Sequence, residues 1–249
     1  DGLCIHLMDT VSGAILHRSV HQAGTGPVQM VAFENWVVYS YWNAKAHRTE
    51  MGTLTLYEGF IDKHGLNPFN QPEQETTFSS FNSPPPIVLQ KTFIFPHAIR
   101  SLGVTRSTHA VTSRHVLVGL HNGQVVSLDR RLLDPRRPDH NPKKDEQAEG
   151  LKRYDPFLPV TPTLVVTYGR TVERMDAIHT APARLESTCL MLTTGLDIYS
   201  MRITPSQTFD LLAEDFNYIL LVTILGGMMI ATIVLRKVVK NKQLSSSWS

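Results

Sequence analysis

FNYILLVTILGGMMIATIVL, residues Phe216–Leu235, decides how this chain is organised, because it is long and apolar enough to cross a membrane. The stretch contains no Asp, Glu, Lys, Arg or His. As an α-helix rising about 1.5 Å per residue it would be about 30 Å long, which matches the hydrocarbon core of a bilayer. An apolar helix in a soluble core is usually shorter, so the stretch predicts a transmembrane helix.

Charged residues on either side of this stretch predict its orientation. Asp210, Glu214 and Asp215 precede it. The basic residues that follow it, with no acid among them, are Arg236, Lys237, Lys240 and Lys242. Such basic flanks stay on the cytoplasmic side of a membrane. We therefore expect a single-pass protein with a cytosolic tail at residues 236–249 and with its bulk on the lumenal or extracellular side.

Gly226 and Gly227 lie in the middle of the predicted span. Small residues allow the backbone of a second membrane helix to approach closely, so the pair is a candidate packing point between helices. A glycine pair that is merely tolerated in lipid is the equal alternative.

Residues 204–215 predict an amphipathic helix that leads into the span. Thr204, Pro205 and Gln207 match a capping box with proline at the first helical position. Apolar residues then recur with the spacing of one helix face, at Phe209, Leu212, Ala213 and Phe216. A continuous helix would join the rest of the chain to the membrane without a flexible linker, and a break near Asp215 is the alternative.

Residues 1–203 predict a mainly β domain of antiparallel hairpins. Runs of alternating apolar residues, or of aromatic and β-branched residues, flank turn residues four times. The strand pairs are 3–8 with 14–16, Trp36–Trp42 with Met51–Tyr57, His115–Leu120 with Val125–Leu128, and Thr188–Leu192 with Leu196–Ile203. Asn122-Gly123 predicts a type I′ turn in the third pair. This pattern suits a β-sandwich or the blades of a β-propeller.

Two long segments, Gly59–Gln90 and Asp129–Pro162, are rich in Pro, Asn or charged residues. We expect insertions between strands, although loops of this length are often functional. The pairs Arg136-Arg137 and Lys143-Lys144 could contact lipid head groups or a partner, but charge runs are more often solvated.

Composition and motifs exclude several classes of function. The formal net charge is only +2 and the basic residues are not clustered among aromatic ones, so we expect no nucleic-acid binding. His17 and His21 are four residues apart, which on a strand separates them by about 13 Å, and no zinc spacing occurs. Phosphate-binding loops, nucleophile elbows and H-E-x-x-H motifs are absent. The sequence therefore predicts no enzyme, no metal and no cofactor.

The two cysteines, Cys4 and Cys189, are far apart in the sequence. A lumenal setting would permit a disulfide between them. Each lies in an apolar strand, where cysteine is often a small buried hydrophobe, so free thiols are favoured. The chain runs from Asp1 directly into a strand, from which we expect the C-terminal piece of a longer protein.

Several strings resemble one family closely. They are ENWVVYSYWNAKAHRTEMGTLTLYEG (Glu34–Gly59), FIFPHAIRSLGVT (Phe93–Thr105), TSRHVLVGLHNGQVVSLDRRLLDPRRP (Thr112–Pro138) and APARLESTCLMLTTGLDIYSMRITPS (Ala181–Ser206). With the terminal span, they resemble the C-terminal region of subunit 1 of the endoplasmic reticulum (ER) membrane protein complex, the EMC. The first hairpin also looks like the blade repeat of quinoprotein-type propellers.

The resemblance implies a mainly β fold, in which antiparallel hairpins form the C-terminal blades of a quinoprotein-like β-propeller followed by one transmembrane α-helix. The domains would be a lumenal partial propeller (1–203), a juxtamembrane amphipathic helix (204–215), a membrane span (216–235) and a cytosolic tail (236–249). The protein would be a type I protein of the ER membrane.

The resemblance also implies a function. The chain would be a non-catalytic scaffold in a chaperone and insertase complex that inserts the transmembrane segments of tail-anchored and multipass clients. Its partners would be the other EMC subunits, transmembrane client proteins and the lipid bilayer. The alternatives are a membrane-anchored quinoprotein-like dehydrogenase and a single-pass cell-surface interaction protein.

Overall fold

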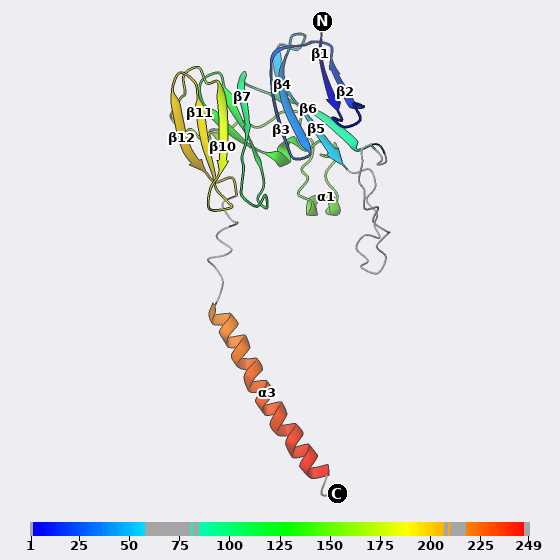
Figure 1. Ribbon diagram of the computed structural model, residues 1–249, viewed down its shortest axis with the longest axis vertical. Coiled ribbons are helices and arrows are strands. Elements are labelled where there is room, and N and C mark those ends of the chain that lie inside the picture. The colour runs from blue at the N-terminus through cyan, green and yellow to red at the C-terminus, as the bar shows by residue number, and fades with distance from the viewer. Residues whose placement is uncertain (1, 58–80, 82–84, 207–208, 210–217, 247–249) are drawn as a thin grey trace. The chain divides into compact units, whose positions relative to one another are not determined.

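The chain folds as two units, Asp1–Ser206 and Gln207–Ser249, and each is described by itself (Figure 1). The computed structural model describes residues 2–57, 81, 85–206, 209 and 218–246. The first unit is rich in β-strands, and the second contains a long helix.

In the described residues of the first unit, the strands form four antiparallel sheets that follow one another along the chain. The first sheet is the hairpin of β1 (Leu3–Met8) and β2 (Ile15–His21). The second sheet consists of β3 (Gly24–Phe33), β4 (Trp36–Asn43), β5 (Arg48–Tyr57) and β6 (Ile87–Phe95). The third consists of β7 (Ile99–Val104), β8 (His115–Leu120) and β9 (Val125–Asp129). The fourth consists of β10 (Ala177–Pro182), β11 (Cys189–Thr194) and β12 (Ile198–Ile203).

Each of the three larger sheets is a meander in which consecutive strands are neighbours. The first strands of successive sheets lie against each other, β3 against β7 and β7 against β10. A short irregular segment takes the fourth position beside β9, where Val165 bridges to Val126 and the N–H of Val166 donates to the carbonyl of Val125 at 2.9 Å. Successive meanders of this kind are the blades of a propeller, which is one of the two expected architectures.

Apolar side chains fill the space between neighbouring sheets. The alternation of side chains along a strand explains how one strand serves two spaces. In β4, Trp36 and Val38 join the core shared with the third sheet, whereas Tyr39 and Tyr41 join a smaller cluster with Ile5 of the hairpin. A third cluster joins the third and fourth sheets, and its fully buried members include Leu117, Val125, Cys189 and Met191.

The segment between β9 and β10 packs onto these sheets. It contains η1 (Arg130–Leu133), α1 (Lys144–Ala148) and η2 (Pro162–Leu164). Leu133 and Leu158 enter the core of the second and third sheets, and the N–H of Leu158 donates to the carbonyl of Ile94 at 3.0 Å. The expected insertion is therefore part of the folded domain.

The basic pairs of this segment behave differently from each other. Lys143 and Lys144 are exposed, as expected. Arg137 is buried, because its guanidinium donates to the backbone carbonyls of Leu132 (2.6 Å) and Lys152 (3.3 Å). The prediction of a solvated pair at 136–137 is thus wrong for Arg137, since these carbonyl partners lie in neighbouring turns of the same segment.

All four predicted hairpins are present, as β1–β2, β4–β5, β8–β9 and β11–β12. Four further strands, β3, β6, β7 and β10, were not predicted from the sequence. Pro27 obscures β3, because proline has no N–H to donate, and the pairing of β3 with β4 shifts register between Thr25 and Gln29. β6 begins at Ile87, within the segment predicted to be irregular as far as Gln90, most of which lies outside the described residues.

The turn between β8 and β9 differs from the predicted type. Gly123 has a positive φ of 82°, but Asn122 does not. A type I′ turn needs positive φ at both central residues, so this prediction is wrong. The Asn122 side chain instead accepts the N–H of Gln124 at 3.0 Å, which holds the turn without a left-handed asparagine.

Gly52 determines how the hairpin β1–β2 meets the second sheet. It lies opposite Tyr39 on the neighbouring strand, and a Cβ atom at Gly52 would come within 2.2 Å of the Tyr39 ring carbon Cζ. The missing side chain lets the Tyr39 ring lie across β5. The Tyr39 hydroxyl then lies 3.2 Å from the hydroxyl of Ser19 in the hairpin.

We predict that Gly52→Ala lowers the free energy of unfolding of the β unit by about 1–3 kcal/mol, the usual cost of overpacking a buried site. Pulse proteolysis in urea on the detergent-solubilised chain would measure the change. Gly169→Ala is the matched control, because nothing lies within 4 Å of its added Cβ. If both variants unfold at the urea concentration of the wild type, the role given to Gly52 is wrong.

Candidate functional site

Helix α3 (Tyr218–Ser246) dominates the second unit. Its stretch Leu221–Lys240 is long and apolar enough to cross a membrane, and these side chains are all exposed. The sequence analysis placed the span slightly earlier, at 216–235, and Phe216 lies outside the described residues. The later end arises because the helix continues past Leu235, and basic side chains near a helix end can extend toward the membrane surface.

The basic residues predicted to anchor a cytosolic tail belong to this same helix. Arg236, Lys237 and Lys240 are exposed on it, and Lys242 lies on its last turns. The predicted tail at 236–249 is therefore helical as far as Ser246. Its cytosolic location stays a prediction.

Gly226 and Gly227 lie on α3 with open space beside them. A Cβ atom built on either residue would meet no atom within 4 Å. Nothing in the described part of the chain packs against the pair, so it leaves a smooth surface on the helix. Their role in helix packing stays a prediction.

Four residues of the predicted lead-in helix at 204–215 are described. Thr204, Pro205 and Ser206 follow β12 without helical structure, and Phe209 lies in a turn. The capping pattern therefore does not begin a helix at Thr204. Thr204 directly follows Ile203, which pairs with Cys189 in the sheet, and this explains why the backbone is not helical at Thr204. The other residues of this helix lie outside the described residues.

The chain leaves the β unit from one edge of the sheets, which we call the exit edge. It comprises the turn after β3 (Glu34–Asn35), the β7–β8 loop (Thr105–Arg114), the β10–β11 loop (Ala183–Thr188) and the end of β12. Figure 1 shows these loops and the end of β12 on the lower side of the sheets. Loops from three sheets therefore meet where the connection to α3 begins.

Arg114 joins the second and third sheets at this edge. Its side chain is only 6% exposed, and its Nε atom lies 3.4 Å from a carboxylate oxygen of Glu34. Its Nη1 atom donates to the hydroxyl of Ser107, and the guanidinium lies 5.2 Å from the ring centre of Phe33. A buried arginine needs such partners, because an unpaired charge is costly away from water.

Glu186 joins the third and fourth sheets. Its carboxylate accepts the backbone N–H groups of His109 (2.9 Å) and Val111 (3.0 Å), and its carbonyl accepts the hydroxyl of Thr112. Desolvation opposes its ionisation, but hydrogen bonds from Ser107, His109 and Val111 outweigh that effect and lower the pKa of Glu186 to about 2. The carboxylate thus stays charged while it holds the β7–β8 loop.

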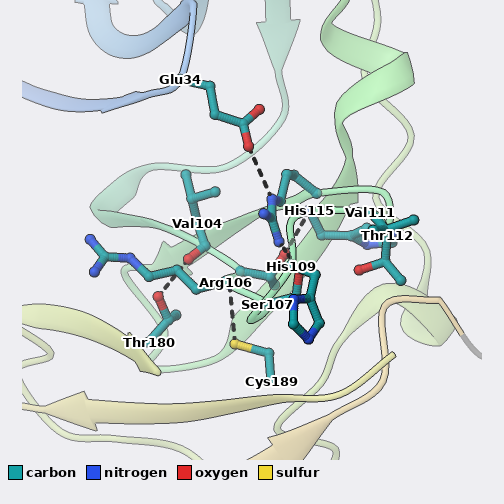
Figure 2. Close-up of polar contacts among 12 residues, drawn as sticks. Glu34, Val104, Arg106, Ser107, His109, Val111, Thr112, His115, Thr180 and Cys189 are labelled. Atoms are coloured by element: carbon teal, nitrogen blue, oxygen red, sulfur yellow. Dashed lines mark hydrogen bonds and ion pairs between the residues drawn. The ribbon is translucent and has the colours of Figure 1, made fainter. Parts of the chain in front are cut away.

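Cys189 lies beneath the same loop. The N–H of Arg106 donates to its sulfur at 3.3 Å, as Figure 2 shows. Burial raises the pKa of the Cys189 thiol. Cys4 is exposed, and both cysteines are free thiols, in line with the favoured expectation.

A second polar cluster joins the hairpin to the second sheet. A ring nitrogen of His21 lies 2.8 Å from the hydroxyl of Tyr39, and the other lies 2.9 Å from that of Tyr41. Tyr41 donates to the carboxylate of Glu50 at 2.6 Å, which also accepts from Arg48 at 2.8 Å. Burial opposes the ionisation of Glu50, but the bonds from Tyr41 and Arg48 contribute to a net lowering of its pKa.

This cluster lines a cavity of about 490 Å³ between the hairpin, the second sheet and Tyr154. The Tyr41 hydroxyl already bonds to His21 and to the Glu50 carboxylate. These groups therefore serve to join the hairpin to the second sheet. Among the described residues, no group of three His, Cys, Asp or Glu side chains could hold a metal ion. His17 reaches the same network through the Gln90 side chain, which donates to the Tyr39 hydroxyl that also bonds His21.

Sequence reasoning missed Arg114, Glu186, Glu50 and Tyr41. No local motif marks them, because each has at least one partner on another strand or loop, although Glu50 also pairs with Arg48 on its own strand and Arg114 with Ser107 in its own loop. The one available signal was the position of Arg114 directly before the apolar strand β8, where a charged side chain must turn away or find a partner.

Comparisons with known proteins agree with this architecture. The family model described as "ER membrane protein complex subunit 1, second beta-propeller" matches residues 2–206. ER membrane protein complex subunit 1 of Xenopus laevis is 42% identical over 245 residues, which are 98% of this chain and 24% of the relative. The protein of that name from Schizosaccharomyces pombe is 32% identical over 249 residues, 99% of this chain and 28% of the relative. The Saccharomyces cerevisiae protein is 29% identical over 255 residues, 99% of this chain and 33% of the relative.

The chain thus spans between about a quarter and a third of the length of these relatives. The family match ends at residue 206, where the β unit also ends, whereas the relatives match almost the whole chain. The likeness therefore extends across the segment that contains α3.

We predict that Glu186→Ala speeds hydrogen exchange in residues 105–114 several-fold, because two backbone N–H groups lose their acceptor. Mass spectrometry of peptides from the loop would measure it, with Glu149→Ala as the control, whose carboxylate pairs with exposed Arg136. Because the folded pKa of Glu186 is depressed to about 2, its contribution is complete above the unfolded pKa and is lost only as pH falls toward 2.

Wild-type protection, corrected for intrinsic exchange, should therefore be the same at pH 5 and pH 7. A loss of protection between these values would show that the carboxylate does not hold the loop.

Proposed function

Because this chain belongs to the family of ER membrane protein complex subunit 1, we propose that it acts in that complex as a non-catalytic scaffold. The β unit holds other subunits on one side of the membrane, and α3 holds them within it. The work of the complex, in this proposal, is to insert the transmembrane segments of tail-anchored and multipass clients into the ER membrane.

The observation that supports a scaffold is the way in which the β unit uses its polar residues. Arg114 pairs with Glu34 of the second sheet, Glu186 bonds the β7–β8 loop of the third, and Tyr41 and Glu50 bond to each other in the seam with the hairpin. A catalytic site instead needs a nucleophile, acid or base that faces a substrate. The described groups bond to other protein groups and do not face a substrate, so we assign them a structural role in the domain.

The distribution of charge supports an orientation for the chain. Arg236, Lys237 and Lys240 lie toward the C-terminal end of α3 and are exposed. Basic residues at a helix end favour the cytosolic side. We therefore place the β unit in the ER lumen and the C-terminal end of α3 in the cytosol.

A physical argument connects a scaffold to insertion. Moving a polar flank of a client through the hydrocarbon core costs several kcal/mol, because its charged and backbone groups lose water. A complex lowers this barrier with a partly hydrated path between membrane helices. Such a path needs helices that are held at fixed spacings, and α3 would hold one of its walls.

We predict that the double substitution Gly226→Leu and Gly227→Leu weakens co-purification of membrane subunits several-fold. Two leucines fill the smooth surface where another backbone could approach, without reducing helix propensity. Native pull-down of the full-length subunit from digitonin-solubilised ER membranes would measure it, together with insertion of a tail-anchored client.

Met228→Leu with Met229→Leu is the matched control, because it changes neighbouring exposed residues of α3 at nearly constant volume. If the glycine variant retains both its partners and client insertion, the packing role is wrong. A wild-type protein recovered as a lone monomer would contradict the scaffold itself and favour a cell-surface or enzymatic reading.

A further inference from the structure

The exit edge carries two exposed apolar side chains at the tips of neighbouring loops. Val111 lies in the β7–β8 loop and is 64% exposed, and Leu185 lies in the β10–β11 loop and is 52% exposed. A single exposed apolar residue is ordinary on a protein surface. This pair is unusual in being held in place by the residue that follows Leu185.

Glu186 provides that fixation. Its carboxylate accepts the N–H of Val111 itself, and the hydroxyl of Thr108 donates to the carbonyl of Ala183 at 3.3 Å. The two tips therefore belong to one hydrogen-bonded platform. An apolar tip on a fixed loop loses little conformational freedom when it enters an apolar phase, which favours its burial there.

The charge around the tips is positive. Arg184 is exposed and directly precedes Leu185. Arg106 is exposed at the start of the β7–β8 loop, with its side chain directed away from Val111 (Figure 2). The exposed acid Glu34 of this edge is paired with the buried Arg114. The Glu186 carboxylate accepts the backbone N–H groups of His109 and Val111. These bonds do not pair it with either exposed arginine. Figure 2 shows the Arg106 side chain extending away from the cluster around His109 and Ser107. Exposed arginines beside apolar tips fit a layer of phosphate head groups over hydrocarbon.

Chain continuity points to the same occupant. β12 ends on this edge, and the candidate span begins at Leu221. Because α3 begins at Tyr218, the chain from Ser206 to this helix can span at most about 40 Å, at about 3.3–3.6 Å per residue. The exit edge therefore needs less extended chain to reach the bilayer than the opposite edge of the same sheets.

The opposite edge also has an exposed apolar tip, Leu196, which is 74% exposed in the β11–β12 turn. Apolar exposure alone thus does not distinguish the two edges. The charge does, because three exposed acids, Glu173, Asp176 and Asp197, outnumber the exposed Arg174 near Leu196. Acidic side chains are repelled by anionic phosphates.

We propose that the exit edge contacts the surface of the bilayer that α3 enters, with Val111 and Leu185 at head-group level and with Arg106 and Arg184 paired to lipid phosphates. The proposal needs α3 to span the membrane but does not depend on the role of the complex in insertion.

Photocrosslinking in ER membranes tests this contact. p-Benzoylphenylalanine is placed at position 111, 185 or 196 of the full-length subunit, in cells whose phospholipids carry an alkyne-tagged acyl chain. After irradiation, the subunit is isolated and its lipid adducts are labelled through the alkyne. Position 196 is the matched control, because it is equally apolar and exposed but lies on the opposite edge.

We expect lipid adducts at positions 111 and 185 that exceed those at 196 several-fold. Arg106→Gln with Arg184→Gln should reduce the adducts at 111, whereas Arg174→Gln near the opposite edge should not. Adducts at 111 and 185 no stronger than at 196, or adducts to another protein in their place, would overturn the proposal. Co-purification of the other subunits, measured in the same samples, reports separately on the scaffold function.

Discussion

Both faces of the central strands β4 and β5 of the second sheet are buried, and this constraint shapes the rest of the β unit. Trp36 and Val38 on one face of β4 need the third sheet to cover them, and Tyr39 and Tyr41 on the other face need the hairpin. A sheet buried on both faces cannot stand alone, because it would expose large apolar areas to water. Sheets stacked side by side in chain order satisfy this requirement with short connections.

The two faces are sealed in different ways. The space between the second and third sheets is filled almost entirely by apolar side chains. The seam with the hairpin instead contains a chain of hydrogen bonds through His21, Tyr41 and Glu50. Apolar packing supplies most of the stability, whereas a satisfied polar network favours one register over others, since a shifted register would leave its members unpaired.

Sequence patterns predicted what depends on neighbours along the chain. Strong alternation identified four hairpins, and a charge-free apolar run identified α3. β3 and β7 were missed because their strand character depends on pairing with β4 and β8, and Pro27 and Gly103 weaken their local signal. The Asn122-Gly123 turn was placed correctly but typed wrongly, because the Asn122 side chain stabilises a different backbone.

The candidate sites also divide into features that depend on local sequence and features that depend on distant contacts. The span was visible in sequence because a bilayer imposes one length and one polarity on any helix that crosses it. The roles of Arg114 and Glu186 were not predicted, since Glu34 and the backbone N–H groups of His109 and Val111, which pair with them, belong to other sheets.

The exit edge combines features that the sequence predicted with features that it did not. Its loops carry the bonds between sheets that sequence could not predict, and the strand that ends there leads to the helix that sequence did predict. Glu186 connects the fourth sheet to the third, and Arg114 connects the third sheet to the second. Both connections lie at the edge where β12 ends, because the strand partners Ile203 and Cys189 place the end of β12 beside the β10–β11 loop. Three sheets are therefore tied together at the edge from which the chain leaves the β unit.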